Sequence, residues 1–229
     1  MIDLSDIQQR LDTVREKMSA AAVHSGRKPS HIELVVISKM QSVEKLREAF
    51  DSGATLFGES RLQEAMTKIS LLPKKARWHF IGHVQKNKVR KLLPRFELFH
   101  SVDSLELALE MDRVAADLGL FPRVLLEVNI AGDSNKFGFI PSALKRVFDE
   151  LLILPRLQVE GFMTMAPLSE DPETSRPIFS ELRLLRDELA RSAGIPLPTL
   201  SMGMSNDYEV AIEEGATLVR VGSAIFRKR

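Results

Sequence analysis

Two kinds of hydrophobic pattern alternate along this chain. Apolar residues recur every three or four positions from Leu4 to Met18, which predicts an amphipathic helix over residues 1–24. Further on, short and nearly continuous apolar runs such as residues 124–130 predict strands that are covered on both faces, as in a parallel sheet. The alternation of such runs with helix-like segments indicates an α/β protein.

The alternation is regular from residue 33 to residue 226. Strands are predicted at residues 33–39, 55–60, 77–82, 97–102, 123–130, 158–165, 199–202 and 217–223. Helices are predicted between them at residues 43–52, 61–70, 86–93, 104–118, 141–152, 172–192 and 207–214. Parallel strands need such crossovers, and these strands predict a single (β/α)8 TIM-type barrel whose outer ring is completed by the N-terminal helix. An open doubly wound sheet is the alternative, with two unprotected edges.

Composition and charge narrow the interpretation. The 229 residues are 44% hydrophobic and predict one domain, with residues 1–24 as the N-terminal helix and residues 33–226 as the barrel. A net charge of +1 gives no bulk electrostatic case for binding nucleic acid or membranes. The absence of cysteine excludes disulfides and thiolate chemistry. The acidic, polar start of the chain fits no secretory signal, so we expect a cytoplasmic protein.

Polar and small residues gather where the last two predicted strands end. In (β/α)8 barrels the working face lies at the carboxyl ends of the strands, and phosphate is often bound after strands seven and eight. Glycines, hydroxyl groups and backbone N–H groups in these turns let the main chain approach an anion. The spacing predicts a phosphate site made of Ser201, Met202, Gly203, Ser205, Gly222 and Ser223.

A lysine and an arginine are expected at the same rim. Lys39 ends the first predicted strand and Arg220 lies in the last, so closure of the barrel makes their strands neighbours. A nearby cation and apolar walls both favour a neutral amine, which forms a Schiff base with an aldehyde. A phosphorylated aldehyde would match the lysine and the anion site together. The alternatives are a lysine directed to solvent and an Arg220 that pairs with Glu59 or Glu127.

Four long motifs carry a resemblance to a known family. They occupy residues 57–64, 78–88, 200–207 and 215–226. They resemble the motifs of the pyridoxal phosphate homeostasis protein family, whose barrel is similar to the N-terminal domain of alanine racemase.

The resemblance implies a cofactor and residues that hold it. Pyridoxal 5′-phosphate is expected as a Schiff base on Lys39, with Arg220 facing the pyridine nitrogen and the two turns holding the phosphate. Ser60 and His79, near the ends of the second and third strands, are further expected cofactor contacts. The chain departs from the family pattern at three positions, where Ser60 replaces the usual Asn, Met40 the usual Thr and Arg227 the usual Gly.

The expected function is a carrier or buffer of the cofactor in vitamin B6 homeostasis rather than an enzyme. An arginine at the pyridine nitrogen does not protonate it, which weakens the ring as an electron sink. The single tyrosine, Tyr208, is predicted in a helix, and no second domain supplies another acid or base. We therefore predict a monomer that hands its cofactor to pyridoxal-phosphate-dependent apo-enzymes. The alternatives are an amino-acid racemase and a Schiff-base aldolase acting on a phosphorylated substrate.

Two further patterns are interpreted without a special function. His79 and His83 lie on a strand-to-loop segment and do not share a face, so no metal site is predicted. The basic run at residues 86–91 belongs to a helix with an apolar face and is predicted to be solvated surface rather than a nucleic-acid site.

Overall fold

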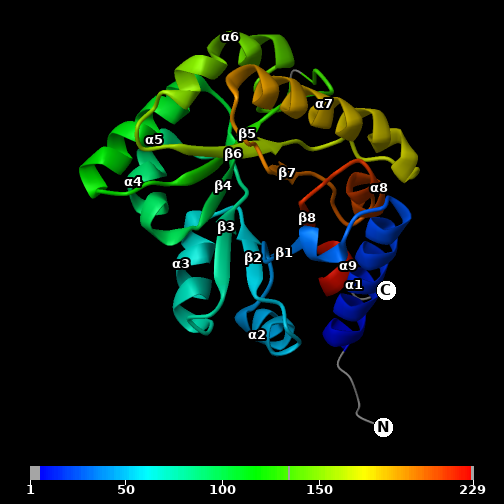
Figure 1. The fold of residues 1–229 in the computed structure, drawn as a ribbon. Coiled ribbons are helices and arrows are strands. Elements are labelled where there is room, and N and C mark those ends of the chain that lie inside the picture. The colour runs from blue at the N-terminus through cyan, green and yellow to red at the C-terminus, as the bar shows by residue number, and fades with distance from the viewer. Residues whose placement is uncertain (1–5, 134, 228–229) are drawn as a thin grey trace.

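The computed structural model describes residues 6–133 and 135–227 and shows a closed barrel of parallel strands inside a ring of helices (Figure 1). The strands are β1 (Glu33–Ile37), β2 (Leu56–Glu59), β3 (Arg77–Phe80), β4 (Leu98–Val102), β5 (Arg123–Glu127), β6 (Gln158–Met163), β7 (Thr199–Ser201) and β8 (Leu218–Val221). Each strand pairs with the next, and β8 pairs with β1. The predicted (β/α)8 barrel is therefore confirmed, and the alternative prediction of an open doubly wound sheet is wrong.

The helices follow the predicted order. The α-helices are α1 (Asp6–His24), α2 (Val43–Asp51), α3 (Leu62–Leu71), α4 (Val89–Leu92), α5 (Leu105–Leu118), α6 (Pro141–Leu152), α7 (Arg176–Ala193), α8 (Tyr208–Glu213) and α9 (Ser223–Phe226). Short 3-10 turns are η1 (Pro29–His31), η2 (Lys86–Lys88), η3 (Leu93–Arg95) and η4 (Pro172–Ser175). Every helix in the described ranges is too short or too polar to cross a lipid bilayer.

Several element boundaries differ from the prediction, and the strands expected at residues 33–39, 123–130 and 158–165 end at Ile37, Glu127 and Met163. The helix expected at residues 86–93 is a broken segment, η2–α4–η3, and its α-helical part ends at Leu92 because Pro94 cannot continue an α-helix. The helix expected at residues 172–192 begins with the turn η4, and α7 starts only at Arg176. The last strand ends at Val221, so Ser223, predicted to be in that strand, instead begins the short helix α9.

The N-terminal helix closes the outer ring, as predicted. α1 runs beside α8 and α9 in Figure 1 and also contacts α2. It buries Ile7, Leu11 and Val14, and Arg10 Nη1 donates to the carbonyl oxygen of Ile225 at 3.2 Å. The expected helix over residues 1–24 is thus observed from Asp6 onward, and residues 1–5 lie outside the described residues.

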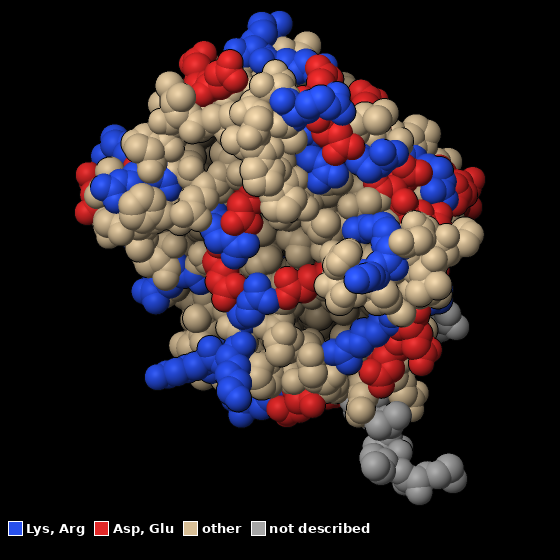
Figure 2. Space-filling model, in the orientation of Figure 1, with Lys and Arg blue, Asp and Glu red and all other residues tan. Residues whose placement is uncertain are grey.

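The core has two parts. A large cluster of apolar side chains fills the space between the strands and the helices. A second, smaller cluster lies inside the barrel and consists of Val35, Leu56, Leu98, Leu125, Met163 and Leu218. Alternate residues of barrel strands point inward, and above this apolar layer the inward positions are polar. On the face shown in Figure 2, acidic and basic side chains both border a central hollow.

Candidate functional site

Arg220 lies on β8 and is almost fully buried in the barrel. Its Nη1 donates to Ser201 Oγ at 2.6 Å, and its Nη2 donates to the carbonyl oxygen of Thr164 at 2.9 Å. Burial lowers the pKa of Arg220 to about 10, and the charge of Glu127 opposes this shift. The guanidinium group is therefore still charged at neutral pH, and two hydrogen bonds fix its orientation.

A chain of hydrogen bonds continues from Ser201 into the barrel. Ser201 Oγ lies 2.9 Å from His100 Nδ1, and His100 Nε2 lies 3.0 Å from His79 Nδ1. Burial lowers the pKa of His79 to about 3 and that of His100 well below its usual value, so both rings are neutral at pH 7. When the neutral His100 ring accepts a hydrogen bond from the Ser201 hydroxyl at Nδ1, its Nε2–H group donates a hydrogen bond to His79 Nδ1. The chain ends at His79 Nε2, which is buried without a hydrogen-bond partner among the described residues.

A cavity of about 280 Å³ lies beside Arg220, next to the turns after β7 and β8. In its wall, Ser205 Oγ accepts hydrogen bonds from the backbone N–H groups of Gly222 at 3.3 Å and Ala224 at 3.2 Å. A Cβ atom at Gly222 would come within 3.0 Å of the Ile37 Cβ, so a larger residue would crowd this wall. Two N–H groups that both donate to one neutral hydroxyl oxygen form a site at which an anionic oxygen can bind instead.

The residues predicted to bind phosphate lie at two depths. Three of them line the cavity: Ser205, Gly222 and Ser223. Ser201 instead points inward, and the N–H group of Met202 is used in the sheet. Gly203 has a φ of 90°, and a Cβ there would lie 2.5 Å from the Ala211 Cβ, so only glycine fits this turn. That all six hold phosphate stays a prediction.

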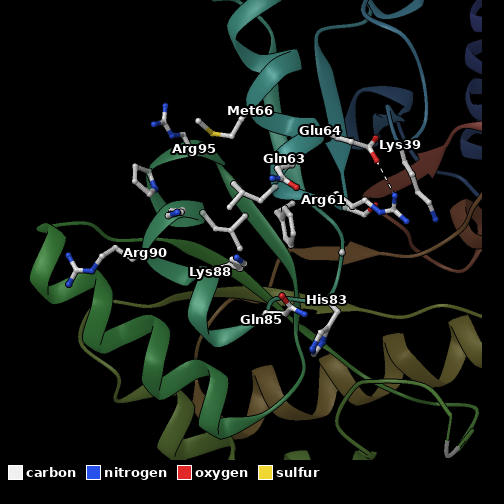
Figure 3. A pocket seen from close by; sticks show the side chains of 17 residues that line it. Lys39, Arg61, Gln63, Glu64, Met66, His83, Gln85, Lys88, Arg90 and Arg95 are labelled. Atoms are coloured by element: carbon white, nitrogen blue, oxygen red, sulfur yellow. Dashed lines mark hydrogen bonds and ion pairs between the residues drawn. The ribbon is translucent and has the colours of Figure 1, made fainter.

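Lys39 follows β1 and is exposed, so the apolar wall expected around its amine is absent. Its strand does lie beside that of Arg220, because Val35 pairs with Arg220. The two side chains nevertheless line different hollows. Lys39 stands at the edge of a larger groove, shown in Figure 3, whereas Arg220 lines the small cavity. Ile37 also lines the small cavity, so the segment that carries Lys39 borders both hollows.

The turn that carries Lys39 has an unusual backbone conformation. Met40 has a φ of 59°, in the left-handed region that non-glycine residues rarely occupy. Its N–H group donates to Glu64 Oε2 at 3.1 Å, and this bond is the main cause of the lowered pKa of Glu64. Helix α3 therefore holds this turn through Glu64, at a position where the chain departs from the family pattern.

A buried ion pair fixes the chain next to Lys39. Lys68 Nζ lies 2.6 Å from Glu59 Oε2 and also donates to the carbonyl oxygen of Ser38 at 2.7 Å. Ser38 Oγ donates to the same carboxylate oxygen, and the N–H group of Ser60 donates to Glu59 Oε1 at 2.7 Å. Glu59 thus pairs with Lys68 and not with Arg220. Ser60, an expected cofactor contact, lines the groove rather than the small cavity.

The two histidines that lie four residues apart point to different surroundings. His79 faces the barrel interior, whereas His83 Nδ1 lies 2.9 Å from Asp103 Oδ2, and the His83 ring stacks on Phe137 with ring centroids 3.9 Å apart. They cannot share one metal ion in this arrangement. Within residues 6–133 and 135–227, no three His, Cys, Asp or Glu side chains are grouped as metal ligands.

Glu127 is the last residue of β5, and its side chain is buried inside the barrel. Burial raises its pKa to about 7, the charge of Asp103 adds to the shift, and that of Arg220 opposes it. A carboxyl group that is partly protonated near neutral pH can both give and accept a proton.

Three residues that shape this site were not found from the sequence. His100 on β4 and Thr164 after β6 hold Ser201 and Arg220 from across the barrel, and Lys68 on α3 holds the end of β1. The alternation along β4 places His100 on the inner face, which was the available signal.

Comparisons with known proteins agree with this architecture. The family described as alanine racemase, N-terminal domain, matches residues 2–229. The chain is 43% identical to the pyridoxal phosphate homeostasis protein of Aquifex aeolicus over 222 residues, 96% of this chain and 97% of that protein. It is 38% identical to the protein of the same name from Synechocystis sp. over 203 residues, 88% of this chain and 93% of that protein.

A solved structure is similar over almost the whole chain. PipY of Synechococcus elongatus PCC7942, with PLP bound, superposes with a TM-score of 0.85 at 36% identity, covering 96% of this chain and 100% of PipY. Together with the two sequence relatives, this shows that the chain belongs to the pyridoxal phosphate homeostasis protein family, as its motifs predicted.

Proposed function

We propose that this protein binds pyridoxal 5′-phosphate as a Schiff base on Lys39. It acts as a carrier or buffer in intracellular vitamin B6 homeostasis, with residues 1–229 forming one monomeric domain that supplies apo-enzymes. The observation that carries the proposal is the fixed, charged guanidinium of Arg220 beside a cavity with two backbone N–H groups. The names of the relatives and the PLP-bound PipY structure support the same cofactor.

The cavity suits a phosphorylated pyridine in its hydrogen-bond donors and its size. The one carboxylate in its lining, Asp207, is already occupied, because it accepts the Met204 N–H at 2.7 Å and the Ser175 hydroxyl at 3.0 Å. Its volume of about 280 Å³ lies just below the range of ~300–1,000 Å³ that is common for ligand pockets, as suits a small cofactor. Among the residues that the structure describes, the N–H groups of Gly222 and Ala224 bond only to the hydroxyl oxygen of Ser205, which a phosphate oxygen can replace. Arg220 has only donors, so it suits an unprotonated ring nitrogen.

Each residue has a distinct part in this proposal. The turns at Ser205 and at Gly222 and Ser223 would hold the phosphate, and Arg220 would orient the ring. Lys39 would supply the amine that an aldehyde needs to form a Schiff base, with loss of one water molecule. For this, its exposed side chain would have to turn from the groove toward the small cavity.

Pyridoxal phosphate supplies an aldehyde and an electron-withdrawing ring when bound. Arg220 keeps its own proton, since its pKa of about 10 lies well above neutral pH. Burial raises the pKa of Tyr208 to about 12, so this tyrosine is a poor base as well. These side chains favour holding a cofactor over turning over a substrate.

One observation favours an amino-acid racemase as the second candidate function. Glu127, with a pKa of about 7, is a buried carboxyl group able to exchange protons near Arg220. Incubation of the loaded protein with L-alanine, followed by chiral analysis, separates the two functions. Turnover of about 1 per second or more would show that the protein is a racemase rather than a carrier.

The proposal is tested by an absorbance spectrum of the loaded protein, followed by borohydride reduction and peptide mapping. We expect a Schiff-base absorbance band and a reduced label on Lys39. Lys39→Ala should abolish both, whereas Lys74→Ala, at an exposed lysine outside both hollows, should retain both. A label on a lysine other than Lys39 would refute the site.

A further inference from the structure

A broad groove of about 1130 Å³ begins at Lys39 and extends along α3 to the segment η2–α4–η3. Figure 3 shows Lys39 at one end and Arg90 and Arg95 toward the other. The basic run at residues 86–91, predicted to be ordinary solvated surface, contributes Lys88, Arg90 and Lys91 to this wall. The run therefore lines the same groove as the residue that is proposed to carry the cofactor.

The groove is strongly basic in a protein that is almost neutral. Six cationic side chains line it: Lys39, Arg61, Lys88, Arg90, Lys91 and Arg95. Among its lining residues Glu64 is the only carboxylate, and it is bonded to Arg61 at 3.4 Å. In the part of the chain that the structure describes, the side chains of Lys88, Lys91 and Arg95 form no ion pair. Unneutralised charges of one sign in a hollow attract ligands of the opposite sign.

The groove also offers apolar contacts between its charges. Met66 is 39% exposed, and Leu62 and Pro94 line the same hollow. Two aromatic rings line it: that of Phe80 is buried, and that of His83 already stacks on Phe137 with ring centroids 3.9 Å apart, which leaves at most one ring face for a nucleic-acid base. Cations interspersed with small apolar surfaces suit an acidic stretch of polypeptide that contains some hydrophobic residues.

We propose that this groove docks an acidic segment of the protein that receives the cofactor. The proposal rests on the carrier function and adds the surface and the charge of the recipient. Docking there would hold the recipient next to Lys39, and opposite charges would speed the encounter. The exposed position of Lys39, at the end of the groove, suits transfer to a partner better than enclosure would.

The test uses the cofactor-loaded full chain and a short fluorescein-labelled peptide of glutamate and leucine, followed by fluorescence anisotropy. Lys88→Glu combined with Lys91→Glu should weaken binding by about ten-fold or more, because two attractive charges become repulsive. Lys74→Glu combined with Lys75→Glu is the matched control, since it changes net charge equally outside the groove and should shift affinity far less. Added salt should weaken binding to the wild-type protein.

The outcomes separate this proposal from the carrier function. If both double variants lose affinity equally, or neither does, the groove is not the docking site, and the Schiff-base spectrum, which does not depend on the groove, decides the carrier function separately. If the wild-type protein forms no Schiff-base band, the carrier function itself fails. A single-stranded oligonucleotide that binds as tightly as the peptide, with the same sensitivity to the Lys88 and Lys91 changes, would assign the groove to nucleic acid and overturn the proposal.

Discussion

Arg220 Nη1 donates a 2.6 Å hydrogen bond to Ser201 Oγ, so two residues predicted to hold opposite ends of one cofactor are bonded to each other. Ser201 is fully buried and also contacts His100 Nδ1 at 2.9 Å. Its hydroxyl group is thus occupied on both sides. This arrangement makes Ser201 a support for the arginine.

Ser201→Ala should therefore lower stability as well as cofactor affinity. The change leaves Arg220 Nη1 and His100 Nδ1 without their partner in a buried place, which costs about 1–3 kcal/mol of unfolding free energy. Urea denaturation of the cofactor-free protein measures this. The comparison is Ser223→Ala, an exposed residue of the small cavity, which should change stability by less than about 0.5 kcal/mol while weakening cofactor binding. A Ser201→Ala protein of full stability that binds the cofactor poorly would make Ser201 a direct phosphate ligand.

The sequence was sufficient for the barrel but not for the contacts inside it. Hydrophobic periods and glycine-rich turns revealed the strands, their order and the rim on which Arg220 and Gly222 lie. Alternation shows which side chains face inward, but His100 and Ser201 are 101 residues apart, and no local pattern tells which inward residues meet. The role of Lys68 could not be predicted for another reason, since a lysine in an amphipathic helix is normally exposed.

The buried histidines predict a loss of stability in acid. Burial lowers the pKa of His79 from 6.5 to about 3, and that of His100 also falls. Between about pH 3 and pH 6.5 the unfolded chain binds protons at these histidines that the folded chain does not. The unfolding free energy therefore falls as pH decreases from about 6.5 toward 3. Each histidine contributes at most about 1.4 kcal/mol per pH unit. His79→Phe should reduce this slope in urea titrations at several pH values, and an unchanged slope would contradict the neutral, buried ring.

The raised pKa of Glu127 predicts the opposite dependence of stability on pH. Its pKa is raised from 4.5 to about 7, so over this interval the folded protein holds a proton that the unfolded chain has lost. The unfolding free energy therefore decreases as pH rises through the interval, by up to about 3 kcal/mol for this group. Glu127→Gln removes the dependence, and the variant should gain stability relative to wild type between pH 5 and pH 8. A constant difference between the two proteins over that range would exclude the raised pKa.

The ion pair between Glu59 and Lys68 should couple the stability of the barrel to the placement of Lys39. Both side chains are buried, and Lys68 Nζ also holds the carbonyl oxygen of Ser38, the residue before Lys39. Lys68→Met leaves the buried Glu59 carboxylate without its cation and should cost about 3 kcal/mol of unfolding free energy. Glu59→Gln should cost less, because Lys68 Nζ keeps its second ion pair, with Glu64 Oε2 at 3.1 Å. The double variant should cost clearly less than the sum, with a coupling of about 1 kcal/mol or more.

An exposed ion pair gives the control for this cycle. Lys145 and Glu188 lie 2.7 Å apart at the surface, and the same pair of changes there should show a coupling below about 1 kcal/mol. If the network also positions the amine, Glu59→Gln should slow borohydride labelling of Lys39 under conditions in which the protein remains folded. Additive costs at Glu59 and Lys68, together with normal labelling, would mean that the pair neither stabilises the barrel nor orients the turn that carries Lys39.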